Sequence, residues 1–140
     1  MINQPPRALG PPTPKPEVPY FNFAPLKNAL AELESEASSY ASWVQGGAAA
    51  TAQDNNLLYT SERELTRDDG LPGRPWFTHH IYAPGFYTGY GVKTIPGVRE
   101  AIEQRQYELV AAEIEVAADV IRAMAARVRQ LAAESRLHDK

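Results

Sequence analysis

The chain has 140 residues, a formal net charge of -3 and no cysteine. This length suits one domain with a core of useful size, and the scattered basic residues make a nucleic-acid partner unexpected. The lack of cysteine excludes disulfides, thiolate zinc sites and thiol nucleophiles.

The apolar residues do not form a membrane-spanning segment. No stretch approaches the ~20 apolar residues that cross a bilayer, and the N-terminus lacks the charged-then-apolar pattern of a secretory signal. We therefore expect a soluble chain without membrane contact. The compartment stays open, because a longer exported parent protein would place the same residues in the periplasm or outside the cell.

Residues 1–19 are rich in proline, which fixes φ and removes backbone donors. The segment is expected to be an extended, polyproline-like linker or arm, followed by a helical domain over 20–140. Such stretches can also dock on aromatic grooves of partners. The prolines are Pro5, Pro6, Pro11, Pro12, Pro14, Pro16 and Pro19.

A first helix is predicted from Phe23 to Val44, because apolar residues recur there at spacings of three and four. Pro25 suits its first turn and Gly46 with Gly47 its end. Its acidic residues Glu32, Glu34 and Glu36 are interpreted as a solvated face. The apolar stripe is Phe23, Leu26, Leu30, Leu33, Ala37, Tyr40 and Val44.

A second helix is predicted over residues 51–66, with Leu57, Leu58 and Leu65 as core contacts. The run Asp54-Asn55-Asn56 inside it favours either a helix cap or an interruption. Residues 67–97 then hold too many Gly and Pro residues for any regular helix. That long loop carries many aromatic side chains, so we expect it to be ordered and packed on the bundle or on another domain.

The helical period returns at Val98 and Ile102 and continues to the end. Whether two helices or one bent helix follow is open. The seam from residue 107 to 131 has strict three-four spacing, and Val120 with small residues beside it leaves further apolar area. The arginines near its end, Arg122, Arg127 and Arg129, are expected to complement the helix dipole. The seam consists of Tyr107, Val110, Ile114, Ala117, Ile121, Met124, Val128 and Leu131.

These elements predict an all-α fold, an antiparallel four-helix bundle with one long ordered loop. The apolar area that a single bundle cannot cover predicts a homodimer, formed through the last helix and the adjoining loop. The sequence leaves a second interpretation open. An unrelated helical adaptor could use the Pro-rich arm and a bundle groove to bind a different protein.

The loop carries a specific motif: Gly70-Leu-Pro-Gly-Arg-Pro75, an aromatic pair, His79-His80-Ile-Tyr-Ala-Pro84, and Ile95-Pro-Gly97 opening the next helix. Order and spacing together resemble the transferrin-receptor-like dimerisation domain of glutamate carboxypeptidase II and its bacterial relatives. The resemblance implies a four-helix domain that pairs across a two-fold axis. It also implies a peptidase domain of the same parent protein as a partner, with the loop lining part of its substrate pocket.

In those carboxypeptidases a Lys-Tyr pair in the loop grips the C-terminal glutamate of the substrate. The resemblance places the Tyr at Tyr90, whereas Gly89 stands in the Lys position. Lys93 is the nearby cation that could serve from another point. The matched motif residues Arg74, His79, Tyr82 and Pro84 are assigned structural roles in the loop.

No catalytic residue and no metal ligand is expected in this chain. The resemblance assigns the catalytic zinc to the peptidase domain, so this chain alone should bind no cofactor and show no activity. His79 and His80 cannot easily share one ion, because neighbours in extended chain point to opposite faces. The glycines of Gly85 to Gly91 lack the Lys-Ser/Thr of a P-loop.

Overall fold

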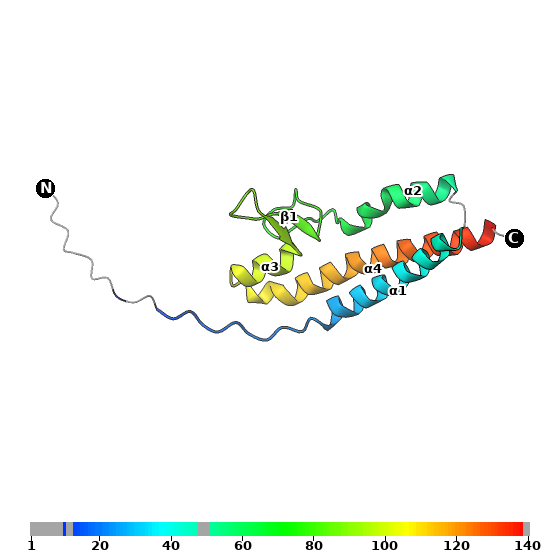
Figure 1. Ribbon diagram of the computed structural model, residues 1–140. Helices are drawn as coiled ribbons and strands as arrows, with labels where there is room; N and C mark the ends of the chain where they lie inside the picture. Colours follow the sequence, from blue (N-terminus) through cyan, green and yellow to red (C-terminus); the bar gives the residue numbers. More distant parts are fainter. Residues whose placement is uncertain (1–9, 11–12, 48–50, 139–140) are drawn as a thin grey trace.

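The computed structural model describes residues 10, 13–47 and 51–138, with side chains up to residue 133. This part of the chain holds four helices and one small hairpin (Figure 1). The mostly helical prediction is confirmed, but the hairpin was not predicted. Most of the expected linker over 1–19 lies outside the described residues, and residues 13–19 form neither helix nor strand. The elements are α1 (Ala24–Gln45), α2 (Ala52–Thr60), the 3-10 helix η1 (Ser61–Leu65), β1 (Tyr82–Pro84), β2 (Val92–Thr94), α3 (Pro96–Glu103) and α4 (Tyr107–His138).

The ends of α1 and α2 follow from their local sequence. Pro25 lies in the first turn of α1, and Gly47 after its end adopts a positive φ of 82°. At the start of α2, Asp54 caps rather than interrupts. Its backbone N–H donates to Thr51 Oγ1, while the Asp54 carboxylate accepts from the Thr51 backbone N–H at 2.8 Å. This reciprocal capping box fixes where the chain turns back after α1.

Two helices follow the loop, which answers the question left open by the sequence. Arg105 adopts a left-handed φ of 61° and separates α3 from α4. The backbone N–H of Gln106 donates to Ala101 O at 2.8 Å across the turn. The two helices form an antiparallel pair, with Glu113 of α4 beside Gly97 of α3 (Figure 1).

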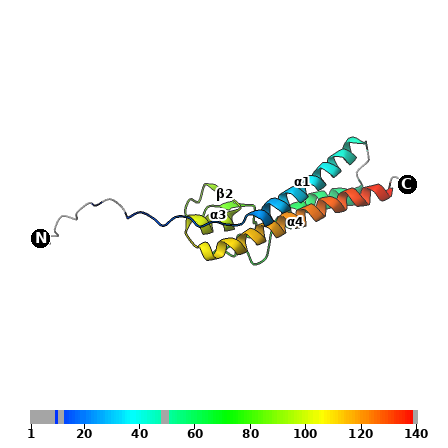
Figure 2. The same cartoon turned by 90° about the horizontal axis from the view of Figure 1, so that it is seen from below.

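The two long helices α1 and α4 lie side by side and run in the same direction (Figures 1 and 2). The contacts agree with this direction. The ring of Phe21, just before α1, contacts the tilted ring of Tyr107 at the start of α4, and Glu36 contacts Arg129 further along both helices. The sequence suggested a bundle that is antiparallel throughout, and this prediction was wrong for the α1–α4 pair. The shorter helices α2 and α3 run back along α4 and therefore oppose both long helices.

The core lies where α1, α3 and α4 meet. It contains Leu26, Ala29, Val98, Ala101, Val110, Ile114, Ala117, Ala118 and Ile121. Val120, which was expected to face a second copy, is only 3% exposed within this chain. Ala118, Ala125 and Ala132 are also buried. These positions therefore belong to the intramolecular packing of α4 and not to a free surface.

The arginines of α4 have specific partners, which the sequence did not predict. Arg127 pairs with Glu64 of η1, and Arg129 pairs with Glu32 and Glu36 of α1. Arg122 bonds Asp119 on its own helix. The interpretation of the Glu32 and Glu36 side as a purely solvated face was wrong, because these carboxylates tie α1 to α4.

No helix in the described ranges is both long and apolar enough to cross a membrane.

The close approach of α3 and α4 leads to a first prediction at Gly97. A Cβ added there would lie 2.0 Å from Glu113 Oε2. The Glu113 carboxylate is the end of a flexible side chain and can move aside, and Ala is usually better than Gly in a helix, so we expect Gly97→Ala to lower the free energy of unfolding by about 1 kcal/mol at most. Urea unfolding of the variant measures this change.

Glu113→Ala supplies the control for that experiment. In its background the obstacle is gone, so Gly97→Ala should become neutral or stabilising, and the two changes should not be additive. Equal effects of Gly97→Ala with and without Glu113 would show that the carboxylate is not what excludes a side chain at this position.

Candidate functional site

The long loop is organised around a buried ion pair between Arg74 and Glu100. Arg74 Nη2 lies 2.6 Å from Glu100 Oε2, and its Nη1 donates to Pro84 O at 2.5 Å. The other carboxylate oxygen of Glu100 accepts from the Phe86 backbone N–H at 2.7 Å. One pair thus connects the Leu-Pro-Gly-Arg turn, the end of β1 and helix α3.

Aromatic rings enclose the Arg74 guanidinium. Its Cζ lies 5.0 Å from the centroid of Phe77 and 5.3 Å from that of Phe86. The residue is 5% exposed, and within the described residues its Nε has no hydrogen-bond partner. Because a buried charge is costly unless paired, the loop depends on Glu100 to keep Arg74 in place.

Loop and hairpin are further held by backbone hydrogen bonds. Arg67 N donates to Thr78 O and Leu71 N to Phe77 O, both at 2.9 Å. Strands β1 and β2 pair antiparallel, with Ala83 opposite Lys93. The long loop is therefore ordered, as predicted, although it contains almost no helix.

His79 and Tyr82 form a small cluster with Glu62 of η1. His79 Nδ1 accepts from the backbone N–H groups of Ile81 and Tyr82, both at 3.2 Å, so the proton of the neutral ring sits on Nε2. The Tyr82 hydroxyl donates to Glu62 Oε1 at 2.5 Å, and its ring lies 4.0 Å from that of His79. Burial lowers the pKa of His79 and favours this neutral form.

His80 points elsewhere and is almost fully buried. Its backbone N–H donates to Leu65 O at 2.9 Å, while its Nε2 has no partner among the described side chains. Burial lowers the pKa of its imidazole, and the nearby Asp69 opposes this only in part. The two adjacent histidines do not converge on a common point.

No group of three or more His, Cys, Asp or Glu side chains in the described ranges is arranged to hold a metal ion. The glycine run offers no phosphate cradle at two of its amides either. Gly85 N donates to Gly91 O, and Gly89 N donates to Gly85 O.

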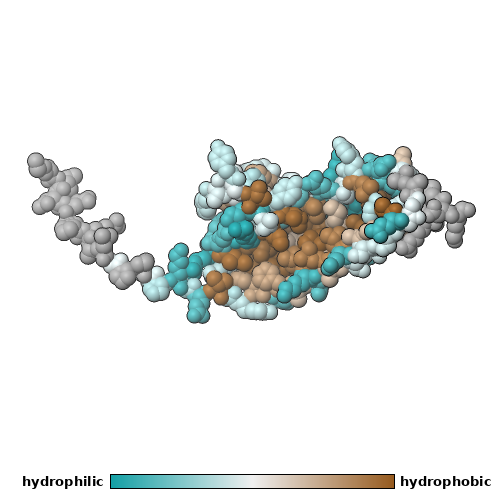
Figure 3. All heavy atoms as spheres, viewed as in Figure 1, coloured by the Kyte–Doolittle hydropathy of each residue, from teal (hydrophilic) through white to brown (hydrophobic). Residues whose placement is uncertain are grey.

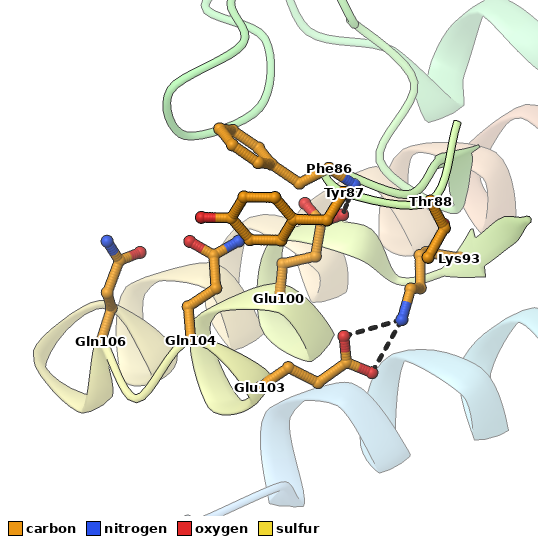
Figure 4. A pocket seen from close by; sticks show the side chains of 8 residues that line it. All are labelled: Phe86, Tyr87, Thr88, Lys93, Glu100, Glu103, Gln104 and Gln106. Carbon is orange, nitrogen blue, oxygen red and sulfur yellow. Dashed lines mark hydrogen bonds and ion pairs between the residues drawn. The ribbon is translucent and has the colours of Figure 1, made fainter. Parts of the chain in front are cut away.

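Lys93 lies at the edge of a cavity of about 480 Å³ between the hairpin and α3 (Figure 4). Its Nζ contacts both oxygens of Glu103, at 2.9 and 2.7 Å, and its side chain is 16% exposed. Hydrogen bonds from Lys93 and from Arg99 lower the pKa of the Glu103 carboxyl. The Lys93 charge is therefore already neutralised within the chain.

Several aromatic residues of the long loop remain outside the core. Tyr90 is fully exposed, and Trp76 and Tyr87 are largely exposed. Phe86 and Tyr87 contact each other edge to face at 4.8 Å, with the Tyr87 ring over the cavity (Figure 4). The sequence predicted that the loop aromatics pack on the bundle or on another domain. Trp76, Tyr87 and Tyr90 do not pack on the bundle.

A second surface of interest runs along α1. The stripe at three-four spacing is buried only at its start: Leu26 is buried, whereas Leu30 and Val44 are each 47% exposed. Ala37 is exposed and Leu33 half-buried. Apolar residues gather in one broad area over α4 and the neighbouring part of α1 (Figure 3). We call Leu30, Leu33, Ala37 and Val44 the α1 stripe.

Sequence reasoning missed the acidic half of each important pair. Glu100 and Glu103 lie on α3 among ordinary helical residues, and nothing in their spacing marked them. The signal that could have predicted them was Arg74 inside the loop motif, because an arginine buried in a loop requires an acidic partner elsewhere in the chain.

Comparisons with known proteins find related sequences. The transferrin receptor-like dimerisation domain matches residues 21–129. A probable glutamate carboxypeptidase of Arabidopsis thaliana is 47% identical over 57 residues, covering 41% of this chain and 8% of that protein. A probable glutamate carboxypeptidase of Arthroderma benhamiae is 32% identical over 92 residues, covering 61% of this chain and 12% of that protein. The chain thus spans about a tenth of these relatives' length.

The buried pair gives a second prediction. Arg74→Met leaves Glu100 buried without its partner and should lower the free energy of unfolding by about 3 to 5 kcal/mol. Arg74→Met with Glu100→Met should cost less than the two single changes added together. Arg67→Met is the matched control, because it breaks the exposed pair with Asp69, and exposed pairs contribute little. Equal losses of unfolding free energy for Arg67→Met and Arg74→Met, measured by urea unfolding, would contradict this prediction.

Buried His80 gives a third prediction, on pH dependence. Burial lowers the pKa of His80 in the folded chain, whereas the ordinary pKa of a histidine is about 6.5. Below about pH 6.5 the unfolded chain therefore binds a proton that the folded chain does not. Stability should be full above this pH and decline below it. His80→Leu should make this decline shallower, measured as the slope of the unfolding free energy between pH 7 and pH 5. An unchanged slope would mean that His80 is not a source of acid sensitivity.

Proposed function

The chain belongs to the transferrin receptor-like dimerisation domain family, and on that premise we propose that it joins two copies of a glutamate carboxypeptidase-like zinc metallopeptidase through the α1 stripe. It is distantly related to the probable glutamate carboxypeptidases named above. The proposal has three parts: that the chain forms a homodimer, that its parent protein is such an enzyme, and that the loop lines the substrate pocket.

The observation that carries the proposal is the half-exposed apolar stripe of α1. A helix that packs on one partner buries its three-four stripe against that partner. Here Leu30, Ala37 and Val44 stay outside the intramolecular core although their spacing suits a helical contact. Contiguous exposed apolar area of this kind marks interaction surfaces, and a second copy would cover it symmetrically.

The aromatic tip of the loop is proposed to face the peptidase domain and to line part of its substrate pocket. Tyr90 is the residue available for a substrate contact, because its side chain is free of the chain's own packing. Lys93 would reach a substrate carboxylate only by leaving Glu103. With Gly89 in the place of the family's lysine, the grip on an acidic substrate end would rest mainly on Tyr90.

Catalysis in this proposal belongs to the parent enzyme and not to this chain. The zinc and the residues that activate water would lie in the peptidase domain. This chain would contribute assembly and one wall of the pocket. It is therefore expected to show no peptidase activity when produced alone.

The fourth prediction compares two matched substitutions on α1. Ala37→Glu puts a charge into the stripe, whereas Ala31→Glu puts the same charge on the same helix about 120° away. Both alanines are exposed, so both variants should fold. Size exclusion with light scattering should give twice the 15.5 kDa chain mass for the parent and for Ala31→Glu, and a monomer for Ala37→Glu.

Two outcomes would count against the proposal. A parent chain that stays monomeric at micromolar concentration would remove homodimerisation by this domain alone. A parent dimer that survives Ala37→Glu would place the interface on another surface. Circular dichroism of each variant checks that the helices are retained.

A further inference from the structure

His79 closes the turn through which the chain enters β1. Its Nδ1 accepts hydrogen bonds from the backbone N–H groups of Ile81 and Tyr82, both at 3.2 Å. In many turns the side-chain oxygen of an asparagine or aspartate accepts such bonds from the backbone two residues on. An imidazole nitrogen differs from an amide oxygen because it takes up a proton in the physiological pH range. The turn is therefore closed by an acceptor that can be titrated.

The two hydrogen bonds and a proton on Nδ1 exclude each other. A protonated imidazole carries an N–H on both nitrogens and has no lone pair left to accept with. At the observed separations of 3.2 Å, three N–H groups would then point at one another. The turn has to open, or the His79 ring has to rotate out of it, before the proton can be accommodated.

The charged and titratable groups around His79 do not remove this conflict. Glu62 of η1 lies 3.7 Å from Nε2 and favours the cation, but its side chain is 65% exposed and already accepts from the Tyr82 hydroxyl. Arg63 and Tyr59 line the same open cavity and supply no negative charge at neutral pH. The adjacent His80 would repel the cation if it were itself protonated. Burial thus lowers the pKa of His79, and Glu62 opposes this only in part.

The backbone on either side of the turn is held independently of His79. Before the turn closes, the N–H of His80 donates to Leu65 O at 2.9 Å, which attaches the chain to η1. After it, the carbonyl of Ile81 accepts from Ile95 N at 2.8 Å, beside the end of β2. Loss of the His79 contacts would therefore open the turn locally and would not unfold the whole loop.

We propose that His79 is an acid-sensitive latch, which holds the entry to β1 closed while its ring is neutral and opens it when Nδ1 takes up a proton. The inference goes beyond the proposed function and does not depend on it, because the latch lies within one copy of the chain. The Tyr82 ring lies 4.0 Å from the His79 ring and its hydroxyl bonds Glu62. Opening would therefore also loosen the attachment of β1 to η1.

The direction of the pH dependence follows from the two states of the turn. In the open turn His79 has its ordinary pKa of about 6.5, whereas burial lowers the pKa in the closed turn. Above about pH 6.5 neither state binds the proton, and the latch has its full strength. Below that pH the open turn binds a proton that the closed turn does not, so opening becomes more favourable by up to about tenfold per pH unit. The gain stops when the pH falls below the lowered pKa of the closed turn.

Hydrogen exchange resolved by NMR measures this opening at single backbone amides. We expect the protection factors of Ile81 and Tyr82, which correct for the intrinsic pH dependence of exchange, to fall several-fold between pH 7 and pH 5. Gly85 is the internal control, because its N–H donates to Gly91 O at 2.8 Å and should keep its protection. The ¹⁵N shifts of the His79 ring at pH 7 should show a neutral ring with its proton on Nε2.

Three substitutions separate the latch from other causes. His79→Asn places an oxygen as many bonds from Cβ as Nδ1 is, and this acceptor is not protonated, so both amides should stay protected at pH 5. His79→Phe keeps a ring without an acceptor, so Ile81 and Tyr82 should exchange fast at both pH values. His80→Leu removes the neighbouring titratable ring and should leave the pH dependence of the two amides in place.

Three results would overturn the latch. Equal protection of Ile81 and Tyr82 at pH 7 and pH 5 in the parent chain would show that the turn does not respond to acid. A fall that persists in His79→Asn would assign the response to another group. A neutral His79 ring with its proton on Nδ1 would rule out both hydrogen bonds. A monomeric parent chain would overturn the proposed function and leave the latch standing, since none of these measurements depends on the dimer.

Discussion

The contact between Arg74 and Glu100 is the constraint on which the central part of the molecule depends. Residues 67 to 95 contain almost no helix, so they lack the repeating hydrogen bonds that would stabilise them locally. The buried guanidinium of Arg74 contacts the hairpin at Pro84 and Glu100 of α3, and Glu100 also accepts from the Phe86 backbone. The turn that carries Arg74, the hairpin and α3 are therefore attached to one another. Because removing either charge would leave the other buried and unpaired, the three segments keep one arrangement.

That arrangement separates two surfaces with different chemistry. The hairpin, anchored through Pro84 and Phe86, carries exposed aromatic rings and a lysine already paired with Glu103. The other surface is the α1 stripe, in which Leu30 and Val44 are each 47% exposed. In the proposed parent enzyme the hairpin would contact the peptidase domain, and the α1 stripe would contact another copy of this chain. One small domain would thus couple assembly to the substrate pocket.

Local patterns predicted the elements, whereas long-range pairing decided their arrangement. The helix bounds followed from three-four spacing, from Pro25 and from the glycines after α1, and the loop motif identified the family. The parallel course of α1 and α4 was not predictable, because an apolar stripe does not encode the direction of its partner. The same limit applies to Glu100 and to the Glu32, Glu36 and Arg129 bridge, whose members are distant in sequence. Val120 was misassigned because its burial depends on which elements pack against α4, and the sequence does not give their positions.

The claim that the α1 stripe joins two copies is tested most directly by a distance between copies. The chain has no cysteine, so Ser38→Cys, beside the stripe and exposed, accepts a single nitroxide label. Each copy then carries one spin, and double electron-electron resonance detects only pairs of copies. We predict one narrow distance distribution, as a two-fold axis requires, which disappears in Ala37→Glu. A signal without dipolar modulation, or one that Ala37→Glu leaves unchanged, would contradict the account.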